Sequence, residues 1–176
     1  MKKTHLELTD NIVLLRPFLL KDAEEHLAGE DEAQRRWLSG GKSTIETVRN
    51  WIQRNLEYWQ QDGPIFTFAI VEAKTHALIG MVEANTEDER VEGIQKGEAN
   101  ISYGLYPFAR GKGYASRAIN LMLGFLQRKG LQAAIIRVDP GNVDSLKIPL
   151  RCGFQELAVV QTSDQRNLVI FRKPLE

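Results

Sequence analysis

The chain has 176 residues, 43% of them hydrophobic, which is enough for a full core, so we predict a single domain over 1–176. Its 23 basic and 23 acidic residues cancel, which argues against nucleic acid and membrane surfaces as partners, because proteins that bind phosphate backbones carry a basic excess. One cysteine, Cys152, excludes an internal disulfide, and with three histidines we expect no metal site. No apolar run approaches the roughly 20 residues of a membrane helix, and we find no secretion signal, so we expect a cytoplasmic protein.

The N-terminal half alternates strand patterns with helical patterns. The predicted elements are a strand at 11–18, a short helix at 21–28, a longer helix at 45–60, and a hairpin of strands at 66–72 and 77–84. Ser43 or Thr44 is the expected N-cap of the longer helix. We interpret the three tryptophans of this half as packing residues rather than a substrate cage: Trp37, Trp51 and Trp59.

The C-terminal half begins with an acidic stretch at 85–96, which we interpret as an exposed loop, and continues with an alternating strand at 98–106. One face of that strand carries Glu98, Asn100, Ser102 and Gly104. Gly104 indicates a bulge or a close approach of a ligand to the backbone. The remaining predicted elements are a helix at 115–129, a strand at 134–138, a helix at 142–153 and an antiparallel pair at 154–161 and 168–173. This order predicts a mixed α+β sheet sandwiched by helices.

A glycine-rich turn before the 115–129 helix is the most informative local feature. Gly111 and Gly113 let successive N–H groups point outward at the positive end of the helix dipole, beside Arg110 and Lys112. Such a turn suits a phosphate or pyrophosphate. A Walker loop is disfavoured because Tyr106 stands where its first glycine belongs. The dinucleotide fingerprint lacks its third glycine, which leaves a nucleotide-binding oxidoreductase as a weak alternative.

Two motifs in this half resemble those of the GNAT acetyltransferase superfamily. The first is Arg110-Gly-Lys-Gly-Tyr-Ala115, which resembles the Q/R-x-x-G-x-G/A loop that binds the pyrophosphate of acetyl-CoA. The second is Asn142-Val-Asp-Ser145-Leu-Lys-Ile-Pro149-Leu-Arg-Cys-Gly153-Phe154, which resembles a segment of the ribosomal-protein N-terminal acetyltransferase branch. Their order and the strand between them also fit. The resemblance implies an acyl-CoA N-acyltransferase-like fold, with a twisted, mostly antiparallel sheet that splays between 104–106 and 137–138.

The resemblance further implies acetyl-CoA as the co-substrate and assigns residues to it. The pyrophosphate would bind the turn and the start of the helix, at Arg110, Gly111, Lys112, Gly113, Tyr114, Ala115 and Ser116. Backbone N–H groups of Leu105 and Tyr106 would bind the pantetheine arm and polarise the acetyl oxygen. Asn142 would contact the same arm, and its side chain also suits the N-cap of the following helix.

Ser145 is our candidate for assisting the departing thiolate. Many members of the superfamily have a tyrosine four residues later, where this chain has Pro149. Proline cannot act as an acid, and it removes the N–H that would bond the carbonyl of Ser145, so we expect a distorted helix there. The base that deprotonates the amine stays open among four candidates, each of which equally suits a solvated surface: Glu83, Glu98, Asn100 and Asp164.

The resulting hypothesis is an acetyl-CoA-dependent N-acetyltransferase that moves an acetyl group to a primary amine by direct attack in a ternary complex. The acceptor is a protein N-terminal α-amine or a small-molecule amine, because the fold and the cofactor loop do not determine it. The alternative is a CoA-binding sensor or scaffold without turnover, since the usual tyrosine is missing. We expect no nucleic-acid or membrane partner, and a monomer or a homodimer.

Overall fold

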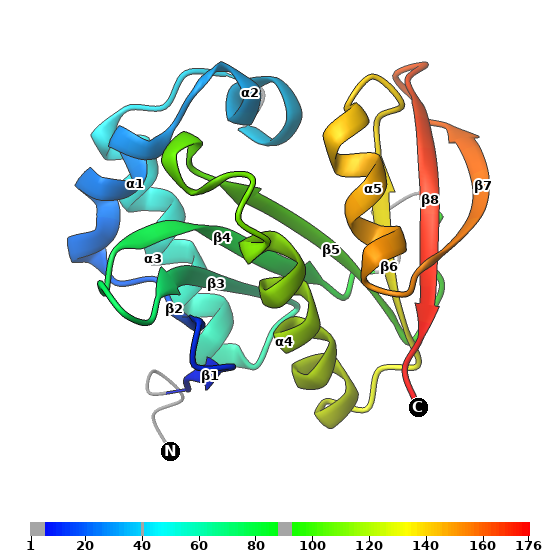
Figure 1. The fold of residues 1–176 in the computed structure, drawn as a ribbon, viewed down its shortest axis with the longest axis horizontal. Coiled ribbons are helices and arrows are strands. Elements are labelled where there is room, and N and C mark those ends of the chain that lie inside the picture. The colour runs from blue at the N-terminus through cyan, green and yellow to red at the C-terminus, as the bar shows by residue number, and fades with distance from the viewer. Residues whose placement is uncertain (1–5, 40, 88–92) are drawn as a thin grey trace.

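The computed structural model describes residues 6–39, 41–87 and 93–176. Its strands are β1 (Leu8–Thr9), β2 (Val13–Pro17), β3 (Ile65–Glu72), β4 (Leu78–Asn85), β5 (Glu98–Leu105), β6 (Ala133–Val138), β7 (Gln155–Gln161) and β8 (Asn167–Pro174). Within the described residues they form one eight-stranded sheet in the order β1-β2-β3-β4-β5-β6-β8-β7 (Figure 1). Only the β5–β6 pair of this sheet is parallel. This arrangement confirms the predicted mixed, mostly antiparallel sheet.

Helices cover both faces of the sheet (Figure 1). They are η2 (Leu20–Asp22), α1 (Ala23–Gly29), α2 (Glu32–Gln34), the π-helical turn η3 (Arg35–Ser39), α3 (Ile45–Gln61), η5 (Pro107–Ala109), α4 (Tyr114–Arg128) and α5 (Val143–Arg151). None of the helices in the described ranges has the length and apolarity needed to cross a membrane. The observed bounds confirm the predicted helices at 21–28, 45–60, 115–129 and 142–153, with small shifts at their ends.

The longest helix, α3, shows how local sequence determines an element. Of the two predicted caps, Thr44 is the one used, because its side chain accepts a hydrogen bond from the N–H of Thr47 at 3.2 Å. Asp62 ends the helix in the left-handed conformation, with φ of 65°. Between these ends Ile52 and Trp59 are buried. Burying each such apolar side chain stabilises the fold by about 1.5–3 kcal/mol, so tertiary packing rather than propensity holds the helix.

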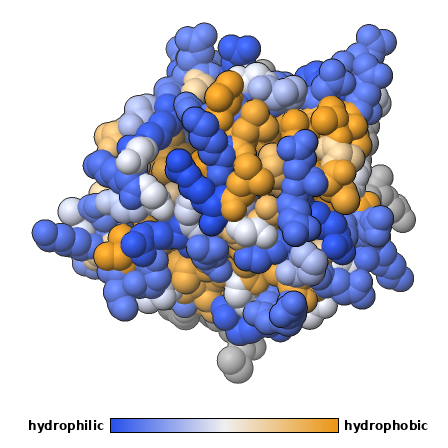
Figure 2. All heavy atoms as spheres, turned by 45° about the vertical axis from the view of Figure 1, so that its right-hand side comes forward, coloured by the Kyte–Doolittle hydropathy of each residue, from blue (hydrophilic) through white to orange (hydrophobic). Residues whose placement is uncertain are grey.

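The core is divided by the sheet into two main clusters. The larger lies on the α4 side and joins apolar residues of β2 to β6 and β8 to Ile119, Met122 and Phe125 of α4. The smaller lies on the side of α1 and α3 and includes Phe18 and Ile52. Figure 2 shows that apolar side chains also gather on the outer surface of the half of the molecule that carries α5 and β7. The large exposed apolar residues of these two elements are Val143, Leu150, Leu157 and Val159.

The sheet opens between β5 and β6. The two strands pair only where Glu98–Asn100 faces Ala133–Ile135. Beyond Asn100, β5 continues along β4 and β6 continues along β8, so that the two strands diverge toward the top of Figure 1. This divergence confirms the predicted splay. It creates an opening between β5 and β6, where the facing backbone groups of the two strands are not paired with each other.

Gly104 and the acidic stretch at 85–96 differ in part from their predicted structures. A bulge at Gly104 is wrong, because β5 keeps a continuous register with β4 through the Met81–Gly104 pair. The two strands approach closely here, since a Cβ added to Gly80 would lie 2.2 Å from the carbonyl oxygen of Gly104. The close approach of a ligand to Gly104 stays a prediction. In the predicted acidic loop, β4 extends to Asn85, and the acidic positions 88, 89 and 92 lie outside the described residues.

Candidate active site

An open cavity of about 1360 Å³ lies along the splay. Its floor is one face of β4 and β5, where Glu83, Asn100 and Ser102 lie next to one another. The α1 and α3 helices supply one wall, including His26 and Trp51, while the glycine-rich turn, β6 and α5 line the other side. The cavity therefore brings together the two sequence motifs that are 30 residues or so apart in the chain, as parallel strands joined by a crossover helix require.

The glycine-rich turn has the geometry of an anion site. Gly111 and Gly113 adopt φ of 74° and 79°, in the left-handed region, and a Cβ on either would meet nothing within 4 Å. These glycines are thus needed for backbone conformation and not for packing. Gly113 is the N-cap of α4 and provides no side-chain cap, so the first N–H groups of the helix face outward at the positive end of its dipole. The assignment of the Arg110–Ser116 segment to a pyrophosphate stays a prediction.

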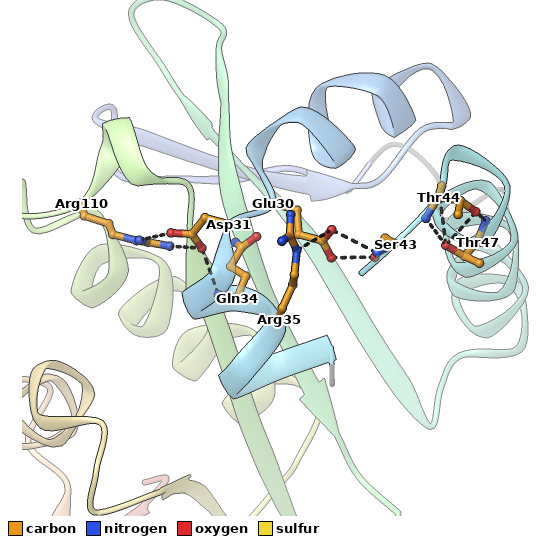
Figure 3. A network of polar contacts seen from close by, with 8 residues as sticks. All are labelled: Glu30, Asp31, Gln34, Arg35, Ser43, Thr44, Thr47 and Arg110. Carbon is orange, nitrogen blue, oxygen red and sulfur yellow. Dashed lines mark hydrogen bonds and ion pairs between the residues drawn. The ribbon is translucent and has the colours of Figure 1, made fainter. Parts of the chain in front are cut away.

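The side chain of Arg110 has a partner of its own. Its guanidinium donates two hydrogen bonds to the carboxylate of Asp31, at 2.6 and 3.0 Å, and its Nε donates to the carbonyl of Leu105 at 3.0 Å. Asp31 also caps α2 by accepting the N–H of Gln34 at 3.0 Å (Figure 3). The hydrogen bond from Arg110 holds the pKa of Asp31 below its usual value. Because its side chain is already paired, Arg110 can bind a phosphate through its backbone N–H. The exposed side chain beside the turn is that of Lys112.

The end of β5 corrects one predicted contact. The N–H of Tyr106 donates to the carbonyl of Ile79 at 2.9 Å and is not available to a thioester. Because successive residues of an antiparallel strand direct their N–H groups to opposite sides, the N–H groups of Tyr103 and Leu105 face away from β4 and into the splay. Leu105 thus remains a candidate for polarising an acyl oxygen, and Tyr106 does not.

The side chain of Tyr106 belongs to an aromatic cluster that the sequence did not indicate. Its hydroxyl lies 2.6 Å from Nδ1 of His26, and the imidazole stacks on Trp51 with ring centroids 4.9 Å apart. Burial lowers the pKa of His26 to about 4, so its ring is neutral near pH 7. Trp59 packs in the core as predicted, but Trp37 and Trp51 also line the cavity. Since 80 residues separate His26 from Tyr106, no local pattern could have revealed this contact.

The second motif forms the start of α5. The side-chain oxygen of Asn142 accepts the N–H of Ser145 at 3.3 Å, which confirms the N-cap interpretation. Its contact with a pantetheine arm, and the role of Ser145 at the thiolate, stay predictions, although both residues line the cavity. Pro149 leaves the carbonyl of Ser145 without its usual partner, and the hydroxyl of Tyr103 donates to that carbonyl at 3.4 Å. Burial raises the pKa of Tyr103 to about 12, so it remains a donor.

The base candidates separate clearly in the structure. Glu83 lines the cavity, accepts a hydrogen bond from the hydroxyl of Thr67 at 2.7 Å, and has a pKa raised by burial. Glu98 is wrong as a candidate, because it is 3% exposed, pairs with Arg172 at 2.8 Å and lies outside the cavity lining. Asp164 also lies outside it, in an exposed pair with Arg166. Among the described residues no group of three or more His, Cys, Asp or Glu side chains could hold a metal.

Solved structures show the same fold at low sequence identity. The ribosomal L7/L12 α-N-protein acetyltransferase RimL in complex with coenzyme A is 15% identical, with a TM-score of 0.82 over 97% of this chain and 98% of that one. The ribosomal-protein-S5-alanine acetyltransferase of Vibrio fischeri is 18% identical, with a TM-score of 0.77 over 97% of each chain. The microcin C7 self-immunity acetyltransferase MccE, in complex with acetyl-CoA and AMP, is 20% identical, with a TM-score of 0.77 over 94% and 93%.

The sequence itself gives the family. Residues 13–155 match the family model described as the acetyltransferase (GNAT) domain. The matched range includes the splay, the glycine-rich turn and the α5 motif, so the three features that form the cavity all lie within it. The chain belongs to the acetyltransferase (GNAT) domain family.

Proposed function

We propose that the protein transfers the acetyl group of acetyl-CoA to the N-terminal α-amine of another protein, by direct attack in a ternary complex. Acetyl-CoA-dependent N-acetyl transfer is the activity of the family to which the chain belongs. The observation that carries the proposal is the splay, because it gives one cavity both an open anion turn at α4 and a buried carboxylate, Glu83. The acetyl donor and the acceptor amine can then meet from opposite faces of the sheet.

Each part of the cavity has a proposed task. The backbone of Gly111 and Gly113 and the first turn of α4 bind the pyrophosphate, and the N–H of Leu105 polarises the acetyl carbonyl. Acetyl-CoA supplies the activated thioester. The hydroxyl of Ser145 gives a proton to the departing sulfur. Pro149, which stands where many members of the superfamily have a tyrosine, has no group that could do so. Positioning these groups also contributes to the rate enhancement, since a bound amine and thioester react as one molecule.

The choice of a protein acceptor rests on the structural neighbours. RimL is an α-N-acetyltransferase of ribosomal L7/L12, and the Vibrio fischeri neighbour is a ribosomal-protein-S5-alanine acetyltransferase. The microcin C7 immunity acetyltransferase supports a small-molecule amine as the second candidate. We also place the reaction in the cytoplasm, where thiols stay reduced. This suits Cys152, a buried free thiol whose pKa burial raises, so that it is chemically inert.

A panel of acceptors tests the proposal. The purified protein is incubated with acetyl-CoA and, in turn, a peptide with a free N-terminal serine, the same peptide with a blocked N-terminus and one lysine, and spermidine. We expect release of free CoA thiol with the first peptide only, and mass spectrometry should place the acetyl group on its α-nitrogen. Acetylation of spermidine alone would establish the small-molecule function instead. Binding of CoA without transfer to any amine would establish a sensor.

A further inference from the structure

One edge of the eight-stranded sheet is a long strand with a neighbour on one side only. β7 pairs with β8, and no other strand of the described ranges pairs with it. Every second residue of such an edge directs its backbone N–H and C=O away from the sheet, so the edge is a template for another strand. The opposite edge is better protected, because β1 has two residues and β2 ends at Pro17, which donates no N–H.

The seven residues of β7 lack the side chains that usually prevent edge pairing. The strand contains no proline, lysine or arginine, and Glu156 is its one charged residue. Proteins that keep an edge unpaired commonly place lysine, proline or inward-pointing charges on it. The ladder with β8 has a bulge at Leu157, but the side chain there is apolar and 62% exposed. The composition of β7 therefore favours pairing with a further strand.

Apolar surface continues from β7 onto the neighbouring helix. Val159 lies opposite Val169 in the β7–β8 ladder, so its side chain is on the face of the sheet that α5 covers, and it is 60% exposed. Val143 and Leu150 of α5 are also exposed, by 59% and 56%. Their spacing places them on one side of the helix, and neither lines the cavity. Figure 2 shows the apolar side chains that gather on this half of the molecule.

A second copy of the chain fits this surface. An antiparallel pair of β7 strands centred on Ala158 has a two-fold axis, so each contact occurs twice. Leu157 of one copy then faces Val159 of the other, and Glu156 faces Val160. The two glutamates lie about 14 Å apart along the pair, which exceeds the screening length of roughly 10 Å at 0.1 M salt. The edge is thus complementary to itself in shape, polarity and charge.

We propose that β7 and the outer side of α5, defined by Val143 and Leu150, form a homodimer interface in which two β7 strands pair antiparallel about a two-fold axis at Ala158. The pair joins the sheets of two molecules into one, and the apolar side chains of α5 cover it from the helical layer. Neither Leu157 nor Val159 lines the cavity, so each copy keeps a cavity of its own. The inference does not depend on the proposed acetyl transfer.

Analytical ultracentrifugation of the purified chain at about 1–100 µM tests the interface. We expect wild type to sediment as a dimer. Val159→Lys should raise the dissociation constant about tenfold or more, because each interface then contains two lysines near the axis. Ile12→Lys is the matched control and should leave the dimer intact, since Ile12 is β-branched, 46% exposed and next to β2 at the far edge of the sheet. Far-UV circular dichroism checks that both variants fold.

A second variant tests the register without adding charge. Equivalent Cα atoms of paired antiparallel strands lie about 4.5–5.5 Å apart, a distance that a disulfide can span. Ala158→Cys should therefore form a covalent dimer under mild oxidation, whereas Ile12→Cys should not. The native Cys152 is buried and does not compete.

Each outcome decides the proposal. It is overturned if wild type stays monomeric at about 100 µM, which would leave the edge to an extended segment of another protein. It is also overturned if Val159→Lys dimerises as well as wild type, or if Ile12→Lys dissociates to the same extent, because another surface would then hold the dimer. If Val159→Lys does not fold, the crosslink decides. A covalent dimer of Ala158→Cys supports the interface, and its absence while wild type sediments as a dimer overturns it.

Discussion

His26 shows how burial determines the charge of a single side chain. Its ring is enclosed by Phe18, Trp51 and Tyr106, and this desolvation lowers its pKa from 6.5 to about 4. The carboxylates of Glu30 and Asp22 act in the opposite direction but more weakly. The imidazole is therefore a neutral part of the cavity wall, able to accept or donate one hydrogen bond with the hydroxyl of Tyr106.

This lowered pKa predicts a pH dependence of stability. Because the unfolded chain binds a proton at His26 more readily than the folded chain does, the stabilisation is complete above pH 6.5 and is lost as the pH falls toward 4. The shift corresponds to about 3 kcal/mol of unfolding free energy. Urea denaturation at several pH values should show this decline in wild type and a shallower one in His26→Gln. An identical decline in the variant would show that carboxylates alone account for it.

At the scale of elements, α4 and α5 differ in how the unpaired N–H groups of their first turns are satisfied. The α4 helix leaves its first N–H groups for a ligand by using Gly113 as its N-cap. The first turn of α5 is capped by the side chain of Asn142. Pro149 has no N–H for the carbonyl of Ser145, and the hydroxyl of Tyr103 donates a hydrogen bond to that carbonyl instead. That hydrogen bond joins β5 to α5 across the splay, next to the predicted thiolate site.

Substituting the glycine of the α4 turn should separate binding from folding. Gly113 and Gly130 have almost the same φ, 79° and 80°, and a Cβ on either meets nothing within 4 Å. Alanine at either position should therefore cost a similar amount of stability, about 1–2 kcal/mol. Only Gly113→Ala should also weaken CoA binding, by about tenfold or more, which calorimetry with CoA measures. Equal CoA affinity in the two variants would remove the pyrophosphate assignment.

At the scale of the whole molecule, an ion pair joins the start of α2 to the glycine-rich turn before α4. Asp31 and Arg110 are 79 residues apart in the chain, and their side chains are 27% and 39% exposed. The α2 cap and the turn are thereby linked through one carboxylate (Figure 3). Glu30 ties the same segment to Ser43, just before α3, at 2.7 Å. The wall of the cavity around Trp37 is thus held by polar contacts rather than by core packing.

A double-mutant cycle on Asp31 and Arg110 measures this link. Asp31→Asn keeps the cap of α2, because asparagine and aspartate cap equally well, and removes only the charge. We expect a coupling of about 0.5–1 kcal/mol with Arg110→Ala in the unfolding free energy, reduced in about 1 M salt by screening. The exposed pair of Asp164 and Arg166, whose side chains are 58% and 62% exposed, is the control and should show almost none. Salt-independent coupling would indicate lost packing instead.

Much of the fold was predictable because it is encoded locally. Strand alternation and helical spacing gave the elements, and Thr44 and Asn142 follow the rules for helix caps. The site was predictable only where its residues are contiguous, as in the glycine-rich turn. Glu98 and Glu83 both read as polar strand residues, and only the tertiary structure shows that Arg172 neutralises one while the other faces the cavity. The His26–Tyr106 and Asp31–Arg110 contacts likewise depend on distant segments.

The splay also makes the ligand part of the architecture. From Ala133 onward the chain forms the other side of the splay, and the contacts that attach it to the rest include three β5–β6 pairs, the packing of α4, the Glu98–Arg172 ion pair and the Tyr103 hydrogen bond. Acetyl-CoA held between β5 and α5 would bridge the two sides of the splay, so mass action would favour the folded, complete chain whenever acetyl-CoA is abundant. A truncated or misassembled copy has only one side of the cleft and gains nothing from it. Metabolite supply would then regulate the lifetime of the catalyst as well as its rate.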